Sequence, residues 1–90
     1  MKKHISITVI GKVQGVFFRA STIEAANLHK VKGCVRNESD GSVYIEAEGE
    51  EDDLKNFIEW CKQGPPLAHV EDCIIEEAAL RNFDTFTITT

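Results

Sequence analysis

The sequence predicts an α+β fold: a two-layer sandwich in which two helices lie on one face of a mostly antiparallel sheet of four to five strands. Several short segments alternate apolar and polar residues, which is typical of half-buried strands, and two longer segments repeat apolar residues every three to four positions, as amphipathic helices do. Their order is β-α-β-β-α-β followed by a further short strand, which is the order of the ferredoxin-like sandwich. Ninety residues supply one hydrophobic core, so we expect a single domain, residues 1–90.

The first predicted strand covers residues 4–10, where apolar and polar side chains alternate. A glycine-containing loop follows, and a helix is predicted over residues 19–29. The inner face of the strand is formed by Ile5, Ile7 and Val9, with Ser6 and Thr8 on the other face. The inner face of the helix is formed by Phe18, Thr22, Ala25, Ala26 and His29.

A β-hairpin is predicted in the middle of the chain. One strand begins at Gly33 and runs through CVRNE, and the sequence SDG at 39–41 indicates a tight turn. The returning strand, SVYIEAE, alternates again. Its inward side chains are Val43, Ile45 and Ala47, and its outward side chains are Tyr44, Glu46 and Glu48.

The second helix is predicted from apolar residues spaced i, i+3, i+4 and i+7. Glu50 to Asp53 place negative charge at its N-terminal end, where the helix dipole favours it, and QGPP at 63–66 ends it because proline cannot continue a helix. We interpret the acidic run Glu46–Asp53 as a solvated strand end and a helix start rather than as metal ligands. Strands near 70–77 and 84–89 complete the chain. The apolar face of the helix is formed by Leu54, Phe57, Ile58 and Cys61.

Composition argues against several classes of protein. A net charge of −5, from 10 basic and 15 acidic residues, disfavours a nucleic-acid binder. No apolar stretch approaches a membrane span and the N-terminus runs directly into a strand pattern, so we expect a cytoplasmic protein without membrane contact. The sequence does not encode the oligomeric state, and a monomer is the default expectation. The cysteines are odd in number and form no C-x-x-C pair, and the histidines lie far apart, so we expect reduced thiols and no metal site. These residues are Cys34, Cys61, Cys73, His4, His29 and His69.

The segment GKVQGVFFRAS, residues 11–21, has the composition of an anion-binding loop. Gly11 and Gly15 permit unusual backbone angles, and successive amides before a helix N-terminus form a nest for an oxyanion. The guanidinium group of Arg19 would add a bidentate contact to a phosphate, and Lys12 and Arg36 would add local positive charge. Read alone, the segment is equally compatible with a connector whose glycines only satisfy turn geometry. Apolar walls for the loop would come from Val13, Val16 and Phe17 or Phe18.

Known nucleotide and phosphatase motifs are absent from the sequence. It contains neither G-x-x-x-x-G-K-[ST] nor G-x-G-x-x-G, and no cysteine is followed by arginine six residues later. A phosphate site without acid, base or metal can still hydrolyse a carboxylic-phosphoric anhydride, because the leaving carboxylate has a conjugate acid of pKa about 4. Catalysis then requires neutralised phosphoryl oxygens and a water held in line. Asn37, polar and uncharged, is the candidate for orienting that water.

Four segments of the chain resemble the acylphosphatase family in order and spacing: GKVQGVFFR at 11–19, GCVRNESDGSV at 33–43, GPPLAHV at 64–70 and the ending FDTFTITT. The resemblance implies hydrolysis of the carboxyl-phosphate bond of small-molecule acyl phosphates without metal or cofactor. It also implies that Arg19 binds the phosphate, that Asn37 orients the water, and that the substrate's own phosphate helps to deprotonate it. The implied phosphate cradle is the backbone of Gln14, Gly15, Val16, Phe17 and Phe18.

The sequence departs from the family pattern at Phe17, where many relatives carry glycine, at Cys34, which replaces a common tryptophan, and in HKVKG at the end of the first helix. These changes leave Arg19 and Asn37 intact, so we expect an active enzyme. The alternative function is a non-catalytic phosphate- or small-ligand-binding regulatory module on the same fold. A single-stranded RNA binder is disfavoured because the strands carry only two aromatic residues, Tyr44 and Phe86.

Overall fold

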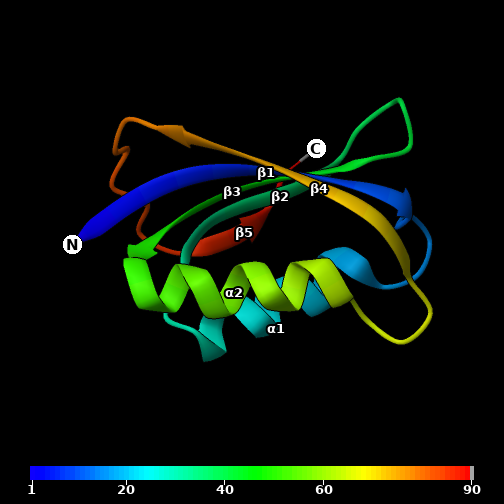
Figure 1. The fold of residues 1–90 in the computed structure, drawn as a ribbon, viewed down its shortest axis with the longest axis horizontal. Helices are drawn as coiled ribbons and strands as arrows, with labels where there is room; N and C mark the ends of the chain where they lie inside the picture. Colours follow the sequence, from blue (N-terminus) through cyan, green and yellow to red (C-terminus); the bar gives the residue numbers. More distant parts are fainter. Residues whose placement is uncertain (90) are drawn as a thin grey trace.

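The structure, a computed structural model, describes residues 1–89; Thr90, the last residue of the expected domain, lies outside the described residues. Two helices and five strands follow one another along the chain (Figure 1). The elements are β1 (Lys2–Lys12), α1 (Phe18–Leu28), β2 (Lys32–Asn37), β3 (Val43–Glu50), α2 (Glu51–Gln63), β4 (His69–Ala78) and β5 (Phe86–Ile88).

The five strands form one sheet in the order β4-β1-β3-β2-β5. All neighbouring strands are antiparallel except β2 and β5, which pair in parallel. Both helices lie on the same face of this sheet (Figure 1). The predicted ferredoxin-like sandwich, with its mostly antiparallel sheet, is confirmed.

The core lies between the sheet and the helices, and it follows the predicted alternation. In the register of β1 with β3, Ile7 pairs with Ile45 and Val9 with Val43, and all four side chains are fully buried. Apolar side chains of the helices cover them, because each helix directs its apolar stripe at the sheet. The buried helix residues are Phe18, Thr22, Ala25, Ala26, Leu54, Phe57 and Cys61.

Glu48 lies on the outward face of the sheet, as predicted, but the prediction that this strand end is solvated is wrong at Glu48. Its side chain lies on the sheet face opposite the helices, as the alternation requires, but its exposed fraction is 0%. The segment between β4 and β5 folds over this face, and its backbone N–H groups at Arg81, Asn82 and Phe83 donate hydrogen bonds to the Glu48 carboxylate. The acidic run Glu46–Asp53 therefore contains a buried carboxylate, Glu48, and is not a wholly solvated strand end.

The element boundaries differ from the predicted ones by one or two residues. Helix α1 begins at Phe18 and ends at Leu28, so His29 is its C-terminal capping residue and is only half-buried. Strand β2 ends at Asn37, because Glu38 already belongs to the turn: its N–H donates to Ser42 O. Among residues 1–89, no helix is both long enough and apolar enough to span a membrane.

Candidate functional site

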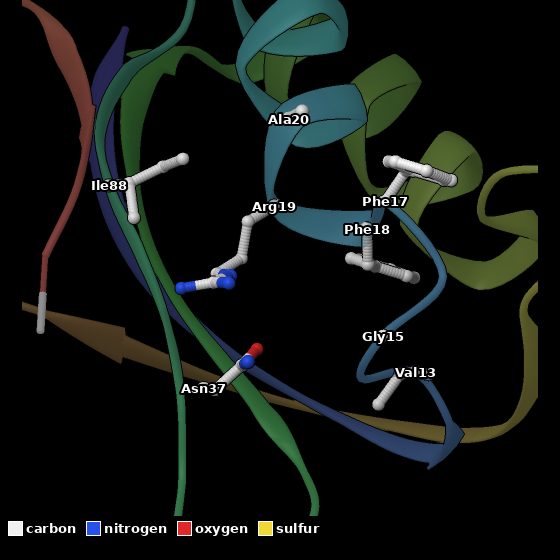
Figure 2. A pocket seen from close by; sticks show the side chains of 8 residues that line it. All are labelled: Val13, Gly15, Phe17, Phe18, Arg19, Ala20, Asn37 and Ile88. Carbon is white, nitrogen blue, oxygen red and sulfur yellow. The ribbon is translucent and has the colours of Figure 1, made fainter.

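A pocket of about 370 Å³ lies where the loop after β1 meets the start of α1 and the ends of β2 and β5 (Figure 2). It brings together residues that are far apart in the sequence, including both predicted catalytic residues. It is lined by Val13, Gly15, Phe17, Phe18, Arg19, Ala20, Asn37 and Ile88.

The loop after β1 has the backbone conformation of an anion cradle. Gly15 and Phe17 both have positive φ, 73° and 64°, which turns successive amides toward one side. In the described residues, the backbone N–H groups from Gln14 to Phe18 donate no hydrogen bond to a backbone carbonyl in the turns, loops and helix caps. These N–H groups lie just before α1 or at its first residue, where a helix leaves its N–H groups without partners. Val16 is buried beneath the loop and holds it against the core. The loop thus presents unpaired donors next to a helix N-terminus.

Arg19 belongs to the first turn of α1. Figure 2 shows its guanidinium group extending from the helix across the pocket toward β2. Within residues 1–89 it makes no ion pair at 4.0 Å or less, whereas Arg36 and Arg81 both pair with glutamates. Its five N–H donors therefore face the pocket without a fixed carboxylate partner.

Asn37 is the last residue of β2, where it pairs with Val43 of β3. Its side chain enters the pocket from the side opposite Arg19 (Figure 2). The Oδ1 atom is buried and has no hydrogen-bond partner among the described residues. Because buried acceptors in native proteins are nearly always satisfied, this oxygen is expected to receive a donor from a bound molecule.

The expected extra positive charge is not found in the pocket lining. Of Lys12, Arg19 and Arg36, only Arg19 lines the pocket. Arg36 lies 3.2 Å from a Glu38 oxygen and stacks 4.5 Å above the Tyr44 ring, so a neighbouring carboxylate offsets its charge. Among the side chains that line the pocket, the positive charge comes from one guanidinium group, that of Arg19.

Two features of the site were not predicted from the sequence. Ile88 of β5 completes one wall of the pocket, and the side chain of Gln14 leaves the pocket to contact the β2–β3 turn. No sequence pattern encodes either placement, because both depend on how distant segments pack. Phe17, assigned to the cradle, lines the pocket with a side chain that is 75% exposed.

The thiols lie outside the pocket lining, and all three cysteines are free. Burial raises the pKa of Cys61, and burial together with the charge of Glu46 raises the pKa of Cys34. Within residues 1–89, no group of three or more His, Cys, Asp or Glu side chains is close enough together to hold a metal ion.

The fold and the site together define a ferredoxin-like domain with a pocket lined by an arginine and an asparagine side chain. Residues 5–88 match the acylphosphatase family model. An acylphosphatase of Syntrophus aciditrophicus is 45% identical over 98% of this chain and 93% of that protein, and one of Thermotoga maritima is 44% identical over 96% of each. The crystal structure of acylphosphatase from Bacillus subtilis matches with a TM-score of 0.95 at 38% identity and covers 100% of both chains. The chain belongs to the acylphosphatase family.

Proposed function

We propose that this acylphosphatase holds the phosphate group of an acyl phosphate with the 11–19 loop and Arg19, while Asn37 orients the attacking water. The main support is the convergence of the unpaired loop amides, the unpaired guanidinium group and the orphaned Asn37 oxygen on one pocket. The loop amides and the Asn37 oxygen lack a hydrogen-bond partner, and the guanidinium group lacks an ion-pair partner. A bound phosphate with a water molecule beside it would supply partners for all three.

The chemistry of the substrate explains why so few groups are needed. Breaking the bond between phosphorus and the bridging oxygen expels a carboxylate, whose conjugate acid has a pKa of about 4, so the leaving group needs no proton at neutral pH. What remains is negative charge on the three phosphoryl oxygens, which backbone N–H groups and a guanidinium group neutralise well in a partly enclosed site. We therefore propose turnover without a metal ion.

Asn37 acts on the water. Its Oδ1 atom accepts a hydrogen bond from one O–H of the water, which directs the oxygen lone pair at phosphorus. An amide serves here because a carboxylate in this place would repel the phosphate. The proton of the attacking water passes to a phosphoryl oxygen of the substrate itself, which fits the absence of an acidic or basic side chain from the pocket lining apart from Arg19.

The proposal predicts different defects for the two residues. Arg19→Ala lowers kcat/KM by at least about 10² to 10³-fold, as loss of a main oxyanion contact does, and weakens the binding of inorganic phosphate. Asn37→Ala lowers kcat comparably and leaves phosphate binding within about threefold of wild type. Turnover is measured optically with benzoyl phosphate in the presence of EDTA, and phosphate binding by calorimetry.

Two matched controls separate these roles from general effects. Arg36→Ala removes the same charge next to Asn37 but outside the pocket lining, and Asn56→Ala removes an exposed amide from α2. Both keep nearly full activity. Full activity in Asn37→Ala would contradict the role of Asn37, and phosphate binding without turnover in the wild type would favour a regulatory module.

We further propose that the enzyme works as a monomer in the cytoplasm. The support for the compartment is an odd number of cysteines, all of them free, which suits a reducing environment. Light scattering at micromolar concentration tests the monomer: a mass near 10.1 kDa supports it, and a doubled mass contradicts it.

A further inference from the structure

The side chain of Gln14 joins the phosphate loop to the turn that follows β2. Its Nε2 group donates two hydrogen bonds, at 2.7 Å to Glu38 O and at 2.9 Å to Ser42 O. These two carbonyls belong to the residues at the two ends of the β2–β3 turn, where Glu38 N–H also donates to Ser42 O at 2.9 Å. Both N–H groups of the Gln14 amide are therefore used, and they bracket the point at which the turn closes.

This contact connects the two halves of the proposed active site. Gln14 lies in the loop that contributes Gly15 and Phe17 to the pocket lining, and Glu38 directly follows Asn37. Among the described residues, no backbone hydrogen bond outside the regular elements joins residues 13–17 to residues 37–43. The Gln14 side chain is thus a direct polar link between the phosphate cradle and the end of the strand that carries Asn37.

We propose that Gln14 is a positioning residue: its side chain fixes the distance between the phosphate cradle and the Asn37 amide, and thereby places the water in line with phosphorus. The inference depends on the proposed roles of the loop and Asn37. In-line attack is sensitive to small displacements, because the reacting atoms must lie about 3 to 3.5 Å apart before reaction. A link that keeps the cradle and Asn37 in register would therefore act on kcat more than on phosphate affinity.

The chemistry of the contact requires an amide. A neutral primary amide offers two N–H donors from one nitrogen, which matches two carbonyl acceptors at hydrogen-bond distance. A glutamate of the same shape would place a carboxylate oxygen against Glu38 O and Ser42 O, where it can only repel them. Gln14→Glu therefore breaks the link with almost no change in volume, and Gln14→Ala removes it and lets water reach the carbonyls.

The test is a double-mutant cycle between Gln14 and Asn37, with benzoyl phosphate as the substrate and inorganic phosphate as the binding probe. In the wild-type background, Gln14→Glu and Gln14→Ala lower kcat at least about tenfold while the Kd for inorganic phosphate changes less than about threefold. In the Asn37→Ala background, the same substitutions change kcat less than about twofold, because the Asn37 amide that Gln14 positions is gone. Gln63→Glu, at the exposed end of α2, is the matched control and keeps the wild-type kcat.

Three results would overturn the inference. The first is a kcat of the Gln14 variants within twofold of wild type although their melting temperature is lowered. The second is a loss of phosphate affinity in these variants as large as their loss of kcat, and the third is a double mutant whose loss of kcat equals the product of the losses caused by the Gln14 and Asn37 substitutions alone. If Gln14→Glu does not fold, Gln14→Ala decides between these outcomes. Failure of the proposed roles is recognised separately, because it appears as wild-type inactivity or as full activity in Asn37→Ala, and either one removes the basis for a positioning role.

Discussion

Replacing the buried Glu48 by glutamine is expected to destabilise the protein strongly without touching the active site. The Glu48 carboxylate accepts hydrogen bonds from three consecutive backbone N–H groups, at 3.1 Å from Asn82 and 2.9 Å from Phe83, with Arg81 N–H as the third donor. His4 Nδ1 also lies 3.9 Å from this carboxylate. The carboxylate therefore holds the segment between β4 and β5 against the sheet.

The size of the loss in the free energy of unfolding follows from the number of N–H donors that the carboxylate accepts. A glutamine side chain has one carbonyl oxygen and one NH2 group, so at least one of the three backbone N–H groups then faces another donor. Loss of one hydrogen bond to a charged group costs about 1.5 to 3 kcal/mol, and the remaining bonds weaken because their acceptor is neutral. We expect a loss of about 3 kcal/mol in the free energy of unfolding. For a domain of this size, that corresponds to a fall of roughly 12 to 24 °C in melting temperature.

The loss is expected to depend on pH. Burial by itself raises the pKa of the Glu48 carboxyl, but the backbone N–H groups of Arg81, Phe83 and Asn82, with His4, outweigh it and lower the pKa below its ordinary value of 4.5. A lowered pKa in the folded state stabilises the protein fully above the unfolded value, and this stabilisation disappears as the pH falls through the folded value. The difference between wild type and Glu48→Gln should therefore be largest near neutral pH and shrink below pH 4.5.

Urea unfolding between pH 7 and pH 3, followed by fluorescence, measures this difference. Trp60 is the single tryptophan, and it packs 5.5 Å from the Phe18 ring, so its emission reports loss of the core. Glu50→Gln makes the same chemical change two residues along β3 at an exposed side chain, and it should cost less than about 1 kcal/mol. Two results would refute this reasoning. The first is a free energy of unfolding for Glu48→Gln within about 0.5 kcal/mol of wild type, which is the size of an ordinary surface change. The second is a difference from wild type that stays constant with pH.

Two further predictions concern positions outside the catalytic pair. Phe17→Gly is expected to leave the free energy of unfolding unchanged or raise it by up to about 1 kcal/mol, because a non-glycine residue with φ of 64° is strained and the exposed ring loses little packing. Urea unfolding measures this change. A loss above about 1 kcal/mol would show that the ring packs against the protein in solution. In the native protein, iodoacetamide should modify the partly exposed Cys73 before Cys34 and Cys61, because those two side chains are buried. Burial raises the pKa of all three thiols, so exposure and not the pKa sets the order. Mass spectrometry of timed samples measures this order, and labelling of Cys61 as fast as Cys73 would contradict the burial.

The elements of this fold were predictable because their signals are local. The alternation around Ile7 and Ile45 and the helical spacing of Leu54 and Phe57 depend only on neighbouring residues, and each segment formed the expected element. The burial of Glu48 was not predictable, since the segment that covers it is irregular and more than 30 residues further along the chain. Periodicity places a side chain on a face of a sheet but does not show what covers that face.

The sequence named Arg19 and Asn37 as candidates, and the structure places both in one pocket, but the geometry of that pocket was not predictable. Gly15 and Arg19 belong to one short segment whose composition is compatible with an anion site as well as with a simple connector, and Asn37 is the candidate for an uncharged group near the phosphate. The side-chain direction of Gln14 and the contribution of Ile88 depend on how β2 packs against the loop and β5. Long-range packing of this kind leaves no pattern in the sequence.

The central claim is that the water held at Asn37 attacks phosphorus, and hydrolysis in ¹⁸O-labelled water tests it most directly. Benzoyl phosphate is hydrolysed by the wild-type enzyme in labelled water, and both products are analysed by mass spectrometry after a single turnover. Because the cradle is proposed to bind the phosphoryl group and Asn37 lines the same pocket, the label should appear in inorganic phosphate and the benzoate should stay unlabelled. Label in the benzoate would mean attack at the carbonyl carbon, and it would contradict the roles given to Arg19 and Asn37.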